Sequence, residues 1–348
     1  MFGIMNLFSD CIGIDLGTVN TVIAIKGQGI VLREPSAVAV AAGRKNEVLA
    51  VGNEAIAMLG RTPGSVTVVY PLKNGVVTDF TLAETMLKSF ITMAVGRRLP
   101  GAGVRAVVCV PGCMSDVERR SLEEALRGAG AREAYLMDEP VAAAIGAGLQ
   151  IDQARGVMIV DIGGGTTDVA VLALGGTVVS RSIRVGGTDL DEAIIHYIRQ
   201  EHGLIVGAST AERLKLTLGS ALSGEPETTL VRGRDVQNGL PCEIKLSAGE
   251  ICYAMKKPVA EIVNAVLETL ERTPPEISGD LLENGITLSG GTAQLRGLTK
   301  LIAHETGIPV ALADDPLDCV ALGALTAVEN LRYYRSSNKR GSRITLPG

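Results

Sequence analysis

The chain has 348 residues, of which 46% are hydrophobic and 20% charged, a composition that excludes general disorder and predicts a packed globular protein. Lys and Arg number 33 against 38 Asp and Glu. The resulting net charge of −5 lacks the basic excess of nucleic-acid-binding proteins, so nucleic acid is not an expected partner. At about 150 residues per domain, the length predicts two domains or one bilobed unit.

The cysteines and the apolar stretches indicate a cytoplasmic protein. The 6 cysteines form no CxxC pair, and the 3 histidines stand at no ligand-like spacing from them, so neither a structural zinc site nor a disulfide framework is expected. We expect these thiols to be small buried hydrophobes in a reducing compartment. No stretch approaches the roughly 18 apolar residues needed to cross a bilayer, and the first residues lack the features of a secretory signal.

Strand-like and helix-like segments alternate along the chain, which predicts the α/β class. The first expected element is a hairpin, in which short apolar strands at 11–14 and 22–25 flank a turn. Apolar residues at helical spacing follow Thr81, and a strand is expected at 102–110. Ser115 and Glu118 predict a capping box that opens a helix running to Arg127.

The second half of the chain continues this alternation. An apolar strand at 134–137 leads into an Ala-rich helix at 141–148, and a later strand is expected at 284–288 before a last helix at 317–325. An apolar stripe at 259–270, ended by two prolines, predicts a long core helix rather than a cofactor-binding segment.

Two pairs of segments repeat in the same order, which predicts a duplicated α/β unit. The turn that begins at Asp15 matches the turn that begins at Asp161, at an offset of 161 − 15 = 146. The segment 138–140, Asp-Glu-Pro, precedes one Ala-rich helix and matches 314–316, Asp-Asp-Pro, before another, at an offset of 314 − 138 = 176. Extra residues after 32 and after 187 account for both offsets.

The two Asp-x-Gly turns carry groups that suit a polyphosphate and a divalent cation. Glycine amides at 163–165 can approach phosphate oxygens because no Cβ intervenes, and Thr18 and Asn20 can donate to the same oxygens. Asp15 and Asp161, facing each other, would hold Mg²⁺ mainly through its waters. The alternative is a pair of ordinary hairpins in which glycine only supplies a positive φ.

Two further segments complete the candidate site. The turn 288–293, Leu-Ser-Gly-Gly-Thr-Ala, follows a strand and precedes a helix, which allows its backbone to lie against a base or a ribose. Glu139 stands at the end of a strand and could orient a water for attack on a γ-phosphate. A carboxylate favoured by the dipole at a helix N-terminus explains Glu139 equally well on local grounds.

Four turn sequences, together with the stretches between them, resemble the actin/Hsp70/sugar-kinase ATPase superfamily and, within it, the MreB/Mbl family of bacterial actin-like rod-shape proteins. They are IDLGTVNT (14–21), DEPVAAAIGAGL (138–149), VDIGGGTTDVAVL (160–172) and LSGGTAQLRGL (288–298). The resemblance covers residues 10 to 330. It implies an α/β, actin-like, duplicated ribonuclease-H-type ATPase fold, with two lobes of five-stranded sheets and a nucleotide cleft between them.

The resemblance also implies lobe boundaries. Lobe I would take residues 1–148, with an inserted subdomain at about 33–75. Lobe II would take residues 149–330, with an insertion at about 188–250, and its last helix would return to lobe I. Residues 331–348 would form a basic, flexible tail.

ATP and Mg²⁺ are the ligands that the resemblance implies, and it assigns roles residue by residue. Glu139, Thr166 and Asp161 match the catalytic positions, of which Glu139 and Thr166 place the lytic water. Asp15 and Asp161 match the metal positions. The positions that contact phosphates are Thr18, Val19, Asn20, Gly163, Gly164 and Gly165. The positions around the ribose and the base are Glu212, Arg213, Leu214, Lys215, Gly290, Gly291, Thr292 and Ala293.

Two residues and one short stretch depart from the family pattern. Asp168 stands where family members commonly have Glu, a change that related chaperone ATPases also show. Thr292 replaces a third glycine, which is expected to put a branched side chain beside the base. The stretch 112–115 replaces a run of small residues, and nothing in the sequence explains what this changes.

The implied function is a slow ATPase, coupled to polymerisation, whose head-to-tail filaments lie on the inner face of the cytoplasmic membrane. There they would organise cell-wall synthesis together with wall-synthesis and rod-complex proteins, and so determine rod shape. Apolar residues between 2 and 8, and Arg97-Arg98-Leu99, are the candidate membrane contacts. A flexible terminus and a solvated loop are the alternative.

Two other functions fit the same fold class. A small-molecule kinase would need an acceptor pocket with its own base, and no motif supplies one. A chaperone-type ATPase would need a substrate-binding domain, for which the chain leaves no room after its last Ala-rich helix.

Overall fold

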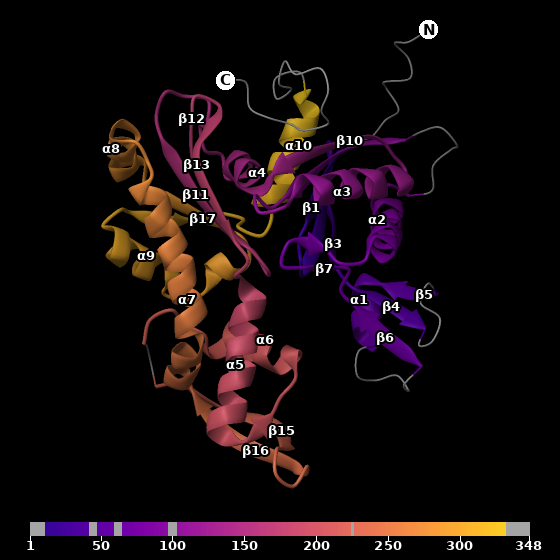
Figure 1. Cartoon of the computed structure of the whole chain (residues 1–348), viewed down its shortest axis with the longest axis vertical. Helices are drawn as coiled ribbons and strands as arrows, with labels where there is room; N and C mark the ends of the chain where they lie inside the picture. Colours follow the sequence, from indigo (N-terminus) through magenta and orange to yellow (C-terminus); the bar gives the residue numbers. More distant parts are fainter. Residues whose placement is uncertain (1–10, 42–46, 59–64, 97–102, 224–225, 332–348) are drawn as a thin grey trace.

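The computed structural model describes residues 11–41, 47–58, 65–96, 103–223 and 226–331. Two five-stranded sheets form its centre (Figure 1). Sheet I has the order β10-β9-β1-β2-β3 and sheet II the order β13-β12-β11-β17-β18. The strands of sheet I are β1 (Cys11–Leu16), β2 (Asn20–Ile25), β3 (Gly29–Pro35), β9 (Val104–Val110) and β10 (Ala131–Asp138). Those of sheet II are β11 (Val157–Ile162), β12 (Thr167–Ala173), β13 (Gly176–Ile183), β17 (Ile286–Ser289) and β18 (Val310–Leu312).

The two sheets have the same topology, which confirms the predicted duplication. In each sheet the first three strands form an antiparallel meander, and two later strands add in parallel beside the first one. The hairpin β1–β2 therefore corresponds to β11–β12, the two elements that carry the Asp-x-Gly turns. The chain has the α/β actin-like fold that the sequence predicts.

Both faces of each sheet are buried, as is typical of sheets with parallel strands. In β11, Met158, Val160 and Ile162 pack into the lobe II core, and Ile159 packs into a separate core on the other face. The lobe II core is formed with α5 (Gly187–His202), α6 (Ala208–Leu218) and α7 (Ala248–Glu271). In lobe I, α2 (Phe80–Val95) and α3 (Asp116–Gly128) pack against sheet I in the same way.

Helices α4 (Glu139–Gly146) and α10 (Cys319–Glu329) share a core with strands of both sheets and lie between the two lobes (Figure 1). They meet backbone to backbone at two glycines. A Cβ on Gly146 would lie 1.8 Å from the carbonyl oxygen of Cys319, and a Cβ on Gly323 would lie 1.9 Å from that of Ala142. The two contacts are symmetric, since 319 − 142 = 177 and 323 − 146 = 177. This offset is one more than the 176 that separates the segments 138–140 and 314–316 before the two helices.

Smaller sheets extend each lobe. In lobe I, β5 (Val48–Val51), β4 (Val38–Ala41) and β6 (Val66–Val69) form a three-stranded sheet with α1 (Gly52–Met58) beside it. In lobe II, β14 (Leu204–Ile205), β15 (Thr228–Asp235) and β16 (Pro241–Ser247) form another. Both lie toward the same end of the molecule (Figure 1). The remaining elements are β7 (Leu72–Lys73), β8 (Val76–Val77), α8 (Pro275–Asn284), the 3-10 helix η2 (Thr292–Gln294) and α9 (Leu298–Thr306).

Most expected elements are present, with informative shifts. The capping box of α3 is formed, since Ser115 N donates to Glu118 Oε2 at 2.7 Å. The last helix begins at Cys319 instead of 317, because Asp318 N donates to the Asp315 carbonyl in a turn. Helix α7 starts eleven residues before the expected stripe (259 − 248 = 11) and contains Pro258.

The cysteines only partly follow the prediction of burial. Cys109 and Cys319 are buried, whereas Cys242 is exposed, so that prediction is wrong for Cys242. None of the helices in the described part of the chain is long and apolar enough to span a bilayer.

Candidate functional site

Two aspartates lie at the ends of the equivalent strands β1 and β11. Burial raises the pKa of Asp15 to about 8, and the charges of Asp161 and Asp318 add to this effect. Burial also raises the pKa of Asp161 to about 6, against the hydrogen bond that Ser289 Oγ donates to its Oδ1 at 2.7 Å. The two strand ends therefore bring Asp15 and Asp161 within electrostatic range of each other, as the duplication predicts.

Glu139 and Asp168 join these aspartates in a carboxyl cluster, defined here as Asp15, Glu139, Asp161 and Asp168. Burial raises the pKa of Glu139 well above its usual value. The charges of the other three carboxyls are the next largest causes of this shift. Only 6% of Glu139 is exposed, although it stands at the first position of α4. Its carboxyl is thus enclosed among other carboxyls, unlike a solvated group at a helix N-terminus.

Asp168 links the two lobes through the turn that follows β9. Its Oδ1 accepts a hydrogen bond from Gly112 N at 2.8 Å, and burial raises its pKa to about 7. A Cβ on Gly112 would lie 3.3 Å from that oxygen, tighter than an ordinary contact. Two of the departures from the family pattern, Asp168 and the stretch 112–115, therefore contact each other.

The two Asp-x-Gly turns face each other in close contact. A Cβ on Gly164 would lie 2.3 Å from Val19 Cγ2, and a Cβ on Gly165 would lie 2.7 Å from Thr18 Oγ1. Neither glycine has a φ in the left-handed region. The alternative that glycine merely supplies a positive φ is wrong here, because the opposing turn leaves no room for a side chain. Asn20, by contrast, is exposed at the start of β2.

A third turn, between β7 and β8, reaches both of these turns. Asn74 and Gly75 have φ values of 49° and 72°, as a two-residue hairpin with the sequence Asn-Gly requires. Gly75 N donates to Thr18 Oγ1 at 3.1 Å, and a Cβ on Gly75 would lie 2.9 Å from Thr166 Cγ2. This contact is not among those predicted above, although the Asn-Gly pair is a strong hairpin signal in the sequence.

The carbonyls of the glycine turn are held from the lobe II side. The Gly163 carbonyl accepts from Gly187 N at 3.0 Å and from Thr292 Oγ1 at 2.8 Å. The Gly164 carbonyl accepts from Thr188 N at 2.7 Å and from Thr188 Oγ1 at 2.8 Å. Gly187 and Thr188 lie in one of the stretches between the four turn sequences that carry the family resemblance, and that resemblance is the signal that could have identified them.

The turn after β17 packs against the end of β11. Gly290 has a φ of 88°, and a Cβ there would lie 2.4 Å from the Ile162 carbonyl oxygen, so no other residue fits. Gly291 is exposed, whereas Ala293 is 1% exposed and packs in the lobe II core. Thr292 is 9% exposed and its hydroxyl is directed at the Gly163 carbonyl.

The residues predicted around the ribose divide into three kinds. Glu212 and Arg213 are exposed on α6. Leu214 is 1% exposed and packs in the lobe II core, so the prediction that includes it among nucleotide-contacting residues fails for its side chain. Lys215 Nζ donates to the Gly187 carbonyl and pairs with Asp191 Oδ2, both at 2.9 Å.

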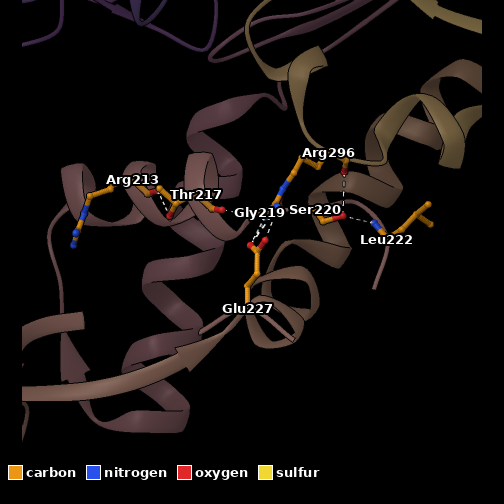
Figure 2. Close-up of polar contacts among 7 residues, drawn as sticks. All are labelled: Arg213, Thr217, Gly219, Ser220, Leu222, Glu227 and Arg296. Atoms are coloured by element: carbon orange, nitrogen blue, oxygen red, sulfur yellow. Dashed lines mark hydrogen bonds and ion pairs between the residues drawn. The ribbon is translucent and has the colours of Figure 1, made fainter. Parts of the chain in front are cut away.

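Arg296 fastens the turn after β17 to the C-terminal end of α6 (Figure 2). Its guanidinium donates to the carbonyls of Thr217 at 3.0 Å and Gly219 at 3.1 Å, and it pairs with Glu227 at 3.2 Å. Its own carbonyl accepts from Ser220 Oγ at 3.2 Å. The side chain of Arg213 extends away from this cluster (Figure 2). The predicted base and ribose segments are thus fixed to each other.

Arg296→Met is expected to lower the free energy of unfolding by about 1–2 kcal/mol, because two charge-assisted bonds to helix carbonyls are lost. Glu227→Gln should cost about 0.5 kcal/mol or less, since the ion pair is partly exposed and the carbonyl bonds remain. Urea unfolding of both variants measures the difference. Equal losses would mean that the ion pair, and not the helix end, is the important partner.

The carboxyl cluster predicts a stability that falls with pH. Because the folded-state pKa values of Asp161, Asp168 and Asp15, about 6, 7 and 8, lie above the ordinary aspartate value, the folded state keeps protons that the unfolded state has lost. This contribution is fully present below the unfolded pKa and is lost as pH rises through 6 to 8. Thermal melts in EDTA without nucleotide should therefore show a melting temperature that decreases from pH 5.5 to 8.5. A melting temperature that rises over this range would contradict the cluster.

The duplicated sheets with their facing hairpin turns define an actin-like α/β protein, and comparison with known proteins agrees. The model of the MreB/Mbl protein family matches residues 9–336. The cell shape-determining protein MreB of Escherichia coli is 49% identical over 94% of this chain and 96% of its own length. The cell shape-determining protein Mbl of Bacillus subtilis is 44% identical over 93% and 97%. The chain therefore belongs to the MreB/Mbl family.

Solved structures show the same likeness. MreB5 of Spiroplasma citri bound to AMPPNP has a TM-score of 0.86 at 35% identity and covers 93% of this chain and 97% of its own. The ADP-bound form gives the same score at 36% identity, with the same coverage. A MamK double helical filament, at 23% identity over 92% of this chain and 99% of its own, has a TM-score of 0.79 and shows likeness of fold alone.

Proposed function

We propose that this chain binds and hydrolyses ATP and forms filaments that organise cell-wall synthesis and determine rod cell shape. The observation that carries the proposal is the close approach of the two duplicated hairpin turns beside the carboxyl cluster. The relatives named for cell shape, and the Spiroplasma citri structures bound to AMPPNP and ADP, support it. A small-molecule kinase gains no support from these relatives.

The donor set fits Mg²⁺ bound together with a polyphosphate. Asp15 and Asp161 offer the hard oxygen ligands that this cation prefers. Burial raises the pKa of both carboxyls, and a bound cation would replace the solvation that their charged forms lack. In the described part of the chain, no group of three or more His, Cys, Asp or Glu side chains is arranged to hold a metal ion alone. Waters and phosphate oxygens would complete the coordination, and the ion would neutralise charge on the phosphates.

The chain's own groups divide the work of hydrolysis. The amides of Gly164 and Gly165 and the hydroxyl of Thr18 hold the phosphates from opposite turns. The predicted phosphate contact of the Gly163 amide is corrected, because that amide donates to the Thr166 carbonyl at 2.9 Å. Glu139 and Thr166, both at least nine-tenths buried, orient the attacking water. Burial of Glu139 among other carboxyls supports this role over that of a solvated helix-end carboxylate, which the sequence left equally possible. Lys215 and α6 border the ribose side.

Filaments would form by head-to-tail contacts, in which one surface of a copy binds a different surface of the next copy. Such contacts give an open filament when successive copies do not close into a ring. The membrane contacts proposed from the sequence, 2–8 and 97–99, lie outside the described residues, as does the basic tail from 332 onward. Peripheral binding at the inner face of the cytoplasmic membrane, and contact with wall-synthesis and rod-complex proteins, are therefore argued from sequence and family alone. The lobe boundaries at 148 and 330 also remain proposals.

Titration of the full chain with a fluorescent ATP analogue, with Mg²⁺ and with EDTA, tests the nucleotide proposal. We expect saturable binding that Mg²⁺ strengthens, phosphate release without any added acceptor, and ATP-dependent pelleting that electron microscopy identifies as filaments. Absence of binding would overturn the proposal, and phosphate release only with a metabolite acceptor would favour the kinase. For the membrane, unchanged co-sedimentation with anionic liposomes after deletion of 2–8 and Leu99→Ser would reject both contacts.

A further inference from the structure

Thr292 makes a contact that the family pattern does not provide for. The position commonly holds glycine in the family, and a branched residue there is expected to face the base. Instead, Thr292 is 9% exposed and its Oγ1 donates to the carbonyl of Gly163 at 2.8 Å. The hydrogen bond joins the turn after β17 to the glycine turn after β11, 129 residues apart in sequence.

Thr292 lies at the meeting point of three elements. Gly187, at the start of α5, donates its N–H to the same Gly163 carbonyl at 3.0 Å. A Cβ on Gly187 would lie 2.7 Å from Thr292 Oγ1 and 3.2 Å from Lys215 Nζ, so the three residues are in contact. Lys215 Nζ in turn donates to the Gly187 carbonyl at 2.9 Å. A continuous set of hydrogen bonds thus runs from α6 through α5 to the glycine turn, and Thr292 adds the β17 turn to it.

The position of these bonds determines what they can do. Both donors to Gly163 approach its carbonyl oxygen, on the opposite side of the peptide group from the Gly164 amide. The Gly163 amide itself donates to the Thr166 carbonyl at 2.9 Å, so the amides of Gly164 and Gly165 are the ones that can meet an anion. A carbonyl with two donors is held more firmly than a carbonyl with one, so the amides are oriented before a ligand arrives, which reduces the cost of binding.

We propose that Thr292 is a positioning residue that couples the base turn to the phosphate-binding turn, so that its hydroxyl strengthens binding of the phosphates of ATP and ADP. This inference rests on the proposed function, because it assumes that the two turns bind the two ends of one nucleotide. It differs from the expectation of the sequence, in which Thr292 would act on the base alone.

The test compares Thr292→Val, which keeps the shape and removes the donor, with Thr292→Ser, which keeps the donor. Thr269→Val is the matched control, since Thr269 is also a buried threonine and its hydroxyl donates to the Ala265 carbonyl within α7, outside the site. Affinities for ATP, ADP and adenosine are measured by competition against a fluorescent ATP analogue. Thermal melts of each variant report folding.

We expect Thr292→Val to weaken ATP and ADP by about 3- to 10-fold, the range of one buried hydrogen bond, with adenosine changed less than 2-fold. Thr292→Ser should bind all three ligands like the original chain, and Thr269→Val should lower only the melting temperature. Equal weakening of adenosine and ATP would overturn the inference in favour of a direct role at the base. Unchanged affinities in Thr292→Val would also overturn it, whereas failure of the original chain to bind ATP would refute the proposed function instead.

Discussion

Asp161→Asn is expected to weaken binding of ATP with Mg²⁺ by about 100-fold or more while it stabilises the protein in the absence of both ligands. Binding weakens because the cation loses a carboxylate for which a neutral amide is a poor substitute. Stability rises because the substitution removes one charge from the carboxyl cluster, whose members are desolvated and repel one another. Nucleotide titration and thermal melting in EDTA measure the two effects, which have opposite signs.

The substitution is conservative in its local contacts. Asn Oδ1 can still accept the hydrogen bond from Ser289 Oγ, so the lost carboxylate charge is the main change. Asp280→Asn is the matched control, since Asp280 also accepts a backbone hydrogen bond, from Gly156 N at 2.7 Å, but lies outside the carboxyl cluster. It should leave nucleotide affinity unchanged. If Asp161→Asn lowers the melting temperature of the free protein, the repulsion within the cluster is not significant.

The parts of the site that sequence could predict are those carried by local pattern. Asp15 and Asp161 end buried strands within equivalent hairpins, and parallel strands beside them bring their ends to one edge of a sheet. The duplication therefore specifies that the two aspartates correspond, and the fold places them near each other. The capping box at Ser115 is equally local, which is why the predicted helix to Arg127 agrees with α3 within a residue or two.

The parts that sequence missed depend on contacts between distant segments. The bonds that hold the Gly163 carbonyl come from residues 187 and 292, and no local pattern pairs them. The orientation of Leu214 was missed for a different reason. Its segment was carried over as a block, whereas a helix turns by about 100° per residue, so neighbouring side chains face different ways. The sequence predicts glycines at 164 and 165 because a Cβ would block close approach, and the structure adds that the opposing turn, as well as a phosphate, would meet that Cβ.

Gly146→Ala and Gly323→Ala are each expected to lower the free energy of unfolding by about 3 kcal/mol or more, at the upper end of overpacking effects. The methyl group of each alanine would lie within 2 Å of a carbonyl oxygen of the opposite helix, 1.8 Å for Gly146 and 1.9 Å for Gly323. Backbone cannot rotate away as a side chain can, so α4 and α10 must move apart. Because α4 begins with Glu139, this movement should also slow ATP hydrolysis.

Urea unfolding measures the loss, and Gly279→Ala provides the contrast. Gly279 lies inside helix α8 with no atom within 4 Å of its ideal Cβ, so alanine there should stabilise by about 0.5–1 kcal/mol. Cys319→Ala should not rescue Gly146→Ala, because the clash is with the carbonyl of Cys319 and not with its side chain. Gly146→Ala combined with Gly323→Ala should lower the free energy of unfolding by less than the sum of the two single losses. The first substitution already separates the helices that the second would force apart. If the two losses add, each contact between α4 and α10 relaxes independently of the other, and the helices do not move apart as rigid bodies.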